Sequence, residues 1–244
     1  MNPFGESAVP VWHSRPRGGT ADVAHTRARL ASLAGGGSGC LEIMCPPPTA
    51  AFSSRDVLLP GYGAACAAVA EEGFPPMIRP VGGHLAVYDR SALVIHLVSR
   101  HQAPRGQIRE RFEIFGEVLA GVLRGYGVDA RIGAIPGEYC DGAYSINAAG
   151  RRKIAGVGQR ITRFGYLLSA VISVRESAAV GRALARGYAE LDLDFDPDTV
   201  GSLAAVAPDA AVGEVEDRVV AALGTVIGLF PDTAELTTLA SVVV

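Results

Sequence analysis

Lysine is almost absent from this 244-residue chain. Of its 22 basic residues, 21 are arginine and only one, Lys153, is lysine. The formal net charge is −3 and the pI is about 6.0, so the composition excludes the basic field of a nucleic-acid-binding protein or a polybasic membrane anchor. Composition alone favours a surface position for Lys153. Its ammonium is nevertheless a compact point charge, which arginine does not imitate.

The chain also lacks long apolar runs, a signal sequence and a disulfide framework. The longest apolar stretch, residues 166–174, is half the length of a membrane span. Residues 1–20 contain no apolar signal region. Four cysteines in a chain of this length do not form a disulfide framework, and no second Cys or His pair follows Cys40 and Cys45 at zinc-site spacing. We therefore expect a cytoplasmic protein that binds no membrane, nucleic acid or metal.

Helical and strand patterns are mixed along the chain without a strict strand–helix–strand repeat. Helices are predicted at residues 22–34, 56–72 with an interruption at Pro60-Gly61, 108–124, 180–191 and 214–229. Strands are predicted at residues 41–45, 50–52, 77–81, 85–88, 92–98, 130–132, 143–147, 153–163 and 165–174. The close spacing of residues 77–98 favours an antiparallel meander. Paired strands separated by single long helices indicate an α+β fold.

The first candidate site is the segment at residues 79–89, between two predicted strands. Gly82 and Gly83 allow a ligand to approach backbone N–H groups, and Arg79 adds a planar guanidinium suited to a carboxylate or phosphate. A tight glycine turn in the meander explains the same spacing. Neither a dinucleotide-binding, a Walker A nor a nucleophile-elbow motif is present.

The second candidate site combines Cys140 with Lys153. Small residues after Lys153 leave room for a bound chain beside its ammonium, which would polarise a carbonyl. Cys140 lies in a glycine-bounded turn, where a thiol is exposed enough to react. The neighbouring Asp141 would raise the pKa of this thiol, so activation requires a cation such as Lys153. An incidental loop cysteine is the alternative reading.

A simple hairpin does not bring these two residues together. With a turn at residues 149–150, Lys153 faces about residue 146 of the preceding strand. The loop before Gly142 must therefore fold back over the strand if Cys140 is to reach Lys153.

These segments resemble the lipoate–protein ligase A/octanoyltransferase family, which has the biotin–lipoate ligase catalytic fold. One family motif is Arg-x-x-Gly-Gly followed by Val-Tyr, and a Lys-Ile-(Ala/Ser)-Gly motif follows some seventy residues later. The matching residues in this chain are Arg79, Gly82, Gly83, Val87, Tyr88, Lys153, Ile154, Ala155 and Gly156. The similarity extends from about residue 27 to residue 203. The Pro-Gly-x-Tyr-Cys-x-Gly segment at residues 136–142 is most similar to the branch that uses a cysteine thioester.

The resemblance implies a mixed, largely antiparallel sheet flanked by helices, in a catalytic domain at residues 21–205. Residues 1–20 would be a flexible N-terminus and residues 206–244 a C-terminal helical tail. An octanoyl or lipoyl group would move between lysines of carrier domains, such as the glycine-cleavage H protein and E2 lipoyl domains. Cys140 would form the thioester and Lys153 would donate to the acyl carbonyl, with no added cofactor. The residues expected to bind the acyl group are Arg79, Gly82, Gly83, His84, Tyr88, Ala155 and Gly156.

Two rival interpretations remain open at this point. An ATP-dependent lipoate ligase would use ATP and Mg and would need no cysteine. Such ligases usually carry a Gly-Asn-x-Asn stretch after the glycine motif, whereas residues 90–94 of this chain contain no asparagine. The other rival is a family member that binds lipoate or a lipoylated domain without catalysing transfer.

Overall fold

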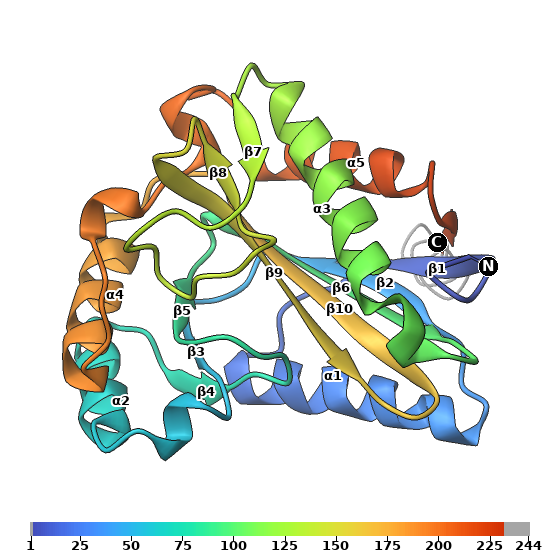
Figure 1. Ribbon diagram of the computed structural model, residues 1–244, viewed down its shortest axis with the longest axis horizontal. Helices are drawn as coiled ribbons and strands as arrows, with labels where there is room; N and C mark the ends of the chain where they lie inside the picture. Colours follow the sequence, from blue (N-terminus) through green and yellow to red (C-terminus); the bar gives the residue numbers. More distant parts are fainter. Residues whose placement is uncertain (1, 232–244) are drawn as a thin grey trace, which may run out of the picture.

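The computed structural model describes residues 2–231 and contains both helices and strands, as the sequence predicts (Figure 1). The strands are β1 (Ala8–His13), β2 (Cys40–Met44), β3 (Thr49–Phe52), β4 (Pro76–Ile78), β5 (Ala86–Tyr88), β6 (Ala92–Arg100), β7 (Ala130–Ile132), β8 (Ile146–Ala148), β9 (Arg152–Ile161), β10 (Gly165–Ser173) and β11 (Gly228–Pro231). The α-helices are α1 (Gly19–Ser32), α2 (Tyr62–Glu71), α3 (Ile108–Arg124), α4 (Ala178–Leu191) and α5 (Val212–Leu223). None of these helices is both long and apolar enough to cross a membrane.

Eight strands form one sheet in the order β11-β1-β2-β6-β10-β9-β8-β7. The pairs that β1 makes with β11 and β2 are parallel, and the remaining pairs are antiparallel. A second, three-stranded sheet has the order β4-β3-β5. The structure therefore confirms the mixed, largely antiparallel sheet.

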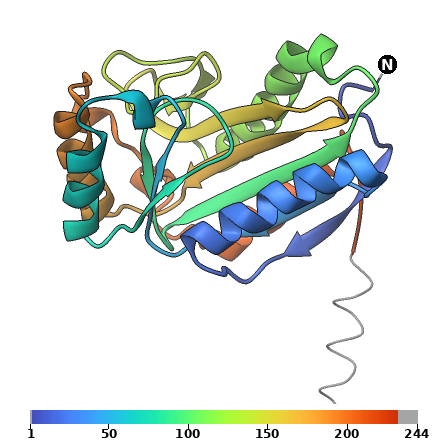
Figure 2. The same ribbon diagram turned by 90° about the horizontal axis from the view of Figure 1, so that it is seen from below.

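The large sheet lies between helices (Figure 2). On one face, α3 and α5 pack over a continuous apolar core, because alternate residues of β2, β6 and β10 point toward them. On the other face, Leu30 of α1 and Leu33, directly after this helix, pack on only part of the sheet. The small sheet packs with α2 and α4 at the side of the molecule (Figure 1). The part of the second face that α1 leaves uncovered adjoins the small sheet.

Several predicted elements differ from those observed. The antiparallel meander is wrong: β4 pairs parallel with β3, and β5 pairs with the opposite edge of β3. The reason is that residues 79–85 form a loop between β4 and β5 instead of a hairpin turn. Residues 143–145 also precede β8 as loop, and residues 224–227 separate α5 from β11 where a continuous helix was predicted.

The terminal segments contribute strands to the large sheet. Within the predicted flexible N-terminus, residues 8–13 form β1, because their alternating apolar side chains are buried beside β2. Helix α5 packs on the same core as α3. Residues 232–244 of the predicted tail lie outside the described residues. The domain boundaries at residues 21 and 205 stay predictions.

Arg111 on α3 is the largest fully buried side chain of the described chain. Its Nε donates to Oε1 of Gln159 at 2.8 Å and its Nη1 donates to the carbonyl of Pro3 at 3.2 Å. Its Nη2 donates to the carbonyl of Pro104, and the guanidinium lies 4.2 Å above the Tyr166 ring. One buried cation therefore joins the N-terminus, α3 and two strands.

We predict that Arg111→Leu lowers the free energy of unfolding by about 3 kcal/mol, because it leaves buried carbonyls without donors. The matched control is Arg109→Leu on the same helix, where the side chain is 84% exposed and pairs only with Glu113. This control should change stability by less than about 0.5 kcal/mol. Urea denaturation measures both. Equal losses in the two variants would contradict the structural role of Arg111.

Candidate active site

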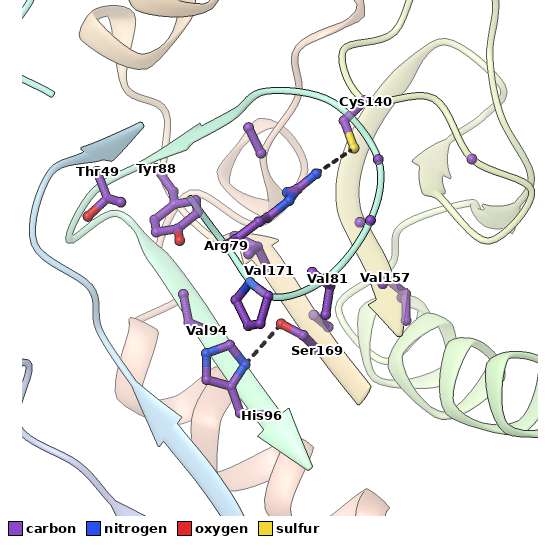
Figure 3. Close-up of a pocket in the computed structure, with 18 of the residues that line it drawn as sticks. Thr49, Arg79, Val81, Tyr88, Val94, His96, Cys140, Val157, Ser169 and Val171 are labelled. Atoms are coloured by element: carbon purple, nitrogen blue, oxygen red, sulfur yellow. Dashed lines mark hydrogen bonds between the residues drawn. The ribbon is translucent and has the colours of Figure 1, made fainter. Parts of the chain in front are cut away.

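A cavity of about 390 Å³ lies over the second face of the large sheet (Figure 3). Its walls come from α1, the strands β5, β6, β9 and β10, the loop of residues 79–83 and the loop of residues 139–145. Its apolar lining includes four valines, Val81, Val94, Val157 and Val171. A cavity of this shape and composition suits a narrow, mostly apolar ligand.

The thiol of Cys140 lies at the wall of this cavity, in the loop between β7 and β8. Nη2 of Arg79 lies 3.1 Å from Sγ, and the backbone N–H of His84 donates to Sγ at 3.3 Å. Figure 3 shows the guanidinium of Arg79 directed at the sulfur. Cys140 itself has a φ of +44°, a conformation that is uncommon outside glycine. The loop thus holds the sulfur beside two donors.

The electrostatic environment favours the thiolate form of Cys140. Burial raises the pKa of its thiol, but the positive charges of Arg79 and Lys153 and the two hydrogen bonds outweigh burial and hold the pKa below its ordinary value of 9.0. The contrast with Cys40 is direct, because burial there raises the pKa to about 11. Cys140 therefore has the charge environment of a nucleophile.

Gly83 allows this close packing. Its φ is +100°, and a Cβ at this position would lie 2.5 Å from Sγ of Cys140 and 2.8 Å from Nη2 of Arg79. Any larger residue would push the guanidinium and the thiol apart. The absence of a side chain at Gly83 thus allows the two loops to come into contact. The sequence suggests only that this glycine lets a ligand approach the backbone.

Lys153, at the start of β9, is fully buried with a side-chain exposure of 1%. Its Nζ donates to the carbonyl of Cys140 at 2.7 Å, to the carbonyl of Tyr139 at 2.9 Å and to Oε1 of Glu138 at 3.2 Å. These three bonds use all of the protons of the ammonium. The hydrogen bonds to Tyr139 and Cys140 show that the loop does fold back over the strand. In the strand register, Lys153 pairs with Asn147 on β8, one residue from the predicted position.

The predicted site residues occupy three different environments. Arg79, Gly82, Gly83, Tyr88, Cys140, Lys153 and Gly156 line the cavity. His84 contributes its backbone N–H, while its Nδ1 lies 2.7 Å from Oδ1 of Asp56. Ala155 is fully buried in the core on the other face of the sheet, beside its strand partner Ile146. The structure therefore brings all of them except Ala155 to the cavity or its rim.

Sequence reasoning missed three residues that position the Cys140 loop. The hydroxyl of Tyr188 on α4 accepts from the Cys140 N–H and donates to the carbonyl of Leu85 at 2.9 Å. Glu138 accepts from Ser145 and from Lys153. Asp56 is buried and pairs with His84. Glu138 was detectable as a carboxylate within the cysteine motif, whereas Tyr188 has no local signal because α4 is distant in sequence.

Comparison with known proteins finds one matching family model and several sequence relatives. The model of the lipoyl protein ligase A/B catalytic domain matches residues 64–224. Octanoyl-[GcvH]:protein N-octanoyltransferase of Geobacillus kaustophilus (strain HTA426) is 30% identical over 143 residues, covering 59% of this chain and 50% of the relative. The protein of that name from Lysinibacillus sphaericus (strain C3-41) is 26% identical over 159 residues, covering 64% and 56%. This chain spans about half the length of the relatives it matches.

Solved structures share the fold at low sequence identity. Lipoate-protein ligase A bound with ATP superposes with a TM-score of 0.69 at 16% identity, covering 94% of this chain and 92% of that one. A chain from the structure of a bi-partite lipoate protein ligase and its E2 lipoyl domain from Thermoplasma acidophilum gives 0.66 at 15% identity, covering 92% and 85%. Because the family model covers well over half of the sequence, this chain belongs to the lipoyl protein ligase A/B catalytic domain family.

Proposed function

We propose that this chain is an acyltransferase that moves an octanoyl or lipoyl group between lysines of carrier domains through a thioester on Cys140. The observation that carries the proposal is the Cys140 thiol, which contacts Arg79 and the His84 N–H at the wall of an apolar cavity. The sequence relatives named as octanoyl-[GcvH]:protein N-octanoyltransferases support this choice over other reactions of the family. Their name suggests GcvH, the glycine-cleavage H protein, as donor, and we propose E2 lipoyl domains, as the family resemblance implies, as acceptors.

The chemistry follows from the thiolate. Its sulfur would attack the carbonyl carbon of the acyl-lysine amide, and the C–N bond would break as the donor amine takes up a proton. The amine of the acceptor lysine would then attack the thioester, lose a proton and release the thiolate. Nearby N–H donors of Arg79 and of the glycine loop would stabilise the negative charge that develops on the carbonyl oxygen. No step requires ATP, because the amide and thioester supply the acyl group.

We propose roles for the two cations that differ from those that the sequence suggests. Arg79 is the cation in direct contact with the sulfur, although the sequence suggests only a ligand-binding or loop-steadying role for it. Lys153 acts on Cys140 through its charge and by holding the backbone of the loop. For Lys153 to donate to an acyl carbonyl, one of its bonds to the loop would have to be exchanged. We therefore propose Lys153 primarily as the residue that positions and charges the nucleophile.

The thioester is tested by intact-mass measurement after incubation with an octanoylated glycine-cleavage H protein. We expect an octanoyl adduct on the wild type that is sensitive to hydroxylamine, and none on Cys140→Ser. The matched control is Cys45→Ser, because Cys45 is partly buried but lies outside the cavity lining. This control should retain the adduct. An adduct that persists in Cys140→Ser would refute the assignment of the nucleophile.

The low pKa of Cys140 predicts the pH dependence of its alkylation. Because only the thiolate reacts, the iodoacetamide reaction of Cys140 should reach half its maximal rate below the pH that is typical of a free thiol. In Arg79→Gln the midpoint should move to higher pH. Burial raises the pKa of Cys140, and the Arg79 charge is the largest of the effects that lower it. Peptide mass mapping follows the label at Cys140. A midpoint that is unmoved in Arg79→Gln would show that Arg79 does not stabilise the thiolate.

If the chain were an ATP-dependent ligase, its activity would require ATP and would not require Cys140. We expect transfer from the octanoylated carrier to an apo E2 lipoyl domain to proceed without ATP and Mg, at a rate that their addition does not change. We further expect Cys140→Ala to lose this transfer by at least a hundredfold, as is usual when a covalent nucleophile is removed. Gel-shift or mass analysis of the acceptor measures both rates. Lipoylation that requires ATP and survives in Cys140→Ala would favour the ligase.

A further inference from the structure

A row of polar side chains crosses the cavity face of the large sheet. Glu42 on β2, His96 on β6 and Ser169 on β10 are register partners in adjacent strands. His96 and Ser169 line the cavity, and Ser169 Oγ lies 2.9 Å from Nδ1 of His96 (Figure 3). The neighbouring row toward Cys140 is apolar, with Val94 and Val171 paired across the same strands.

Glu42, at one end of the polar row, contacts basic side chains. Glu42 is 2% exposed, and its Oε1 lies 3.1 Å from Nη1 of Arg17 and 3.7 Å from Nε2 of His25 on α1. Burial lowers the pKa of His96 below its ordinary value of 6.5, so the ring is neutral at pH 7. Within residues 2–231, Nε2 of His96 makes no hydrogen bond. One ring nitrogen therefore remains to interact with a ligand.

Strand geometry gives the distance from this row to the end of the cavity where Gly156 lies beside Lys153. The Cβ position of Gly156 lies 3.4 Å from Cε of Lys153, and Gly156 pairs with Val171. Ser169 is two residues further along β10, so it lies about 8 Å from Gly156, and His96 lies about 12 Å away on the next strand. An extended eight-carbon acyl chain advances about 9 Å over its seven C–C bonds. With its carbonyl beside Gly156, where Lys153 holds the Cys140 loop, the last carbons of such a chain would reach Ser169 and His96.

We propose that the His96–Ser169 pair contacts the far end of the acyl chain. The pair would favour chains that carry a heteroatom at that end, such as the lipoyl group, over a saturated octanoyl chain. This inference rests on the proposed acyl-transfer function. A terminal methyl group would cover the pair without replacing the hydrogen bonds that water makes to it. A hydroxyl at the sixth to eighth carbon supplies a hydrogen-bond partner for the serine hydroxyl or the free ring nitrogen, and a sulfur at these carbons supplies a weaker acceptor.

Calorimetric binding of free acids tests the pair without any transfer step. The probes are octanoate, 8-hydroxyoctanoate, which adds a polar end without a ring, and lipoate. In the wild type we expect both polar-ended acids to bind more tightly than octanoate. In Ser169→Ala and His96→Leu this preference should fall about three- to tenfold, the usual effect of losing one hydrogen bond. Ser169→Ala is the conservative variant, and it decides the question if His96→Leu does not fold.

The matched control is Val171→Ala, which enlarges the cavity at the neighbouring row of the same strand without changing its polarity. It should change the affinities for octanoate and 8-hydroxyoctanoate together and leave their ratio unchanged. A wild-type preference for octanoate, a ratio that Ser169→Ala does not move, or an equal shift in Val171→Ala would each overturn the inference. The inference would also be overturned if none of the three acids binds.

Failure of the proposed function gives a different result. If the binding ratio behaves as expected but no acyl adduct forms on Cys140, the thioester mechanism fails while the reading of the chain end stands. If the adduct forms but the ratio is insensitive to Ser169→Ala, only the role of the polar pair is refuted.

Discussion

The geometry of the site depends on a buried ammonium that must find three hydrogen-bond acceptors. Lys153 enters the core at the start of β9, where water does not reach it, and an unpaired charge there would cost several kcal/mol. The acceptors come from one short loop: the carboxylate of Glu138 and the carbonyls of Tyr139 and Cys140. The loop therefore has to fold back onto the strand. A planar guanidinium could not direct its donors into so small a space, which explains why this position is lysine in an arginine-rich chain.

Placing that loop also determines the state of the thiol. The backbone of Cys140 is fixed from two sides, by Lys153 at its carbonyl and by Tyr188 at its N–H. Its side chain is thereby directed at Arg79, and Gly83 leaves the space for this contact. Burial alone would make the thiol as inert as that of Cys40. The two cations reverse this effect, so fold stability and nucleophile activation use the same contacts.

The sequence predicted most of the local structure and part of the site. Cys140 and Lys153 could be paired because both lie in motifs with chemical meaning, and the hairpin register required the loop to fold back. The partner of the thiol could not be predicted, because Arg79 reaches Cys140 through the packing of two loops that are 61 residues apart. Ala155 was assigned to the wrong face because a bulge between Ile146 and Asn147 shifts the register of β8 against β9. Strand β1 was missed because its pairing partners are distant in sequence.

The two faces of the large sheet show why the polar row concerns the ligand and not the fold. Both faces are buried, and on the face under α3 and α5 the side chains of β2, β6 and β10 are apolar apart from Ser99 and the hydroxyl of Tyr166, which both donate to the carbonyl of Phe4. On the other face, Glu42, His96 and Ser169 introduce polar atoms at the centre of the same strands, and burying such groups opposes folding unless they are paired. Of these three residues, His96 and Ser169 lie where the sheet forms the cavity floor, so their cost is best explained by what the cavity holds.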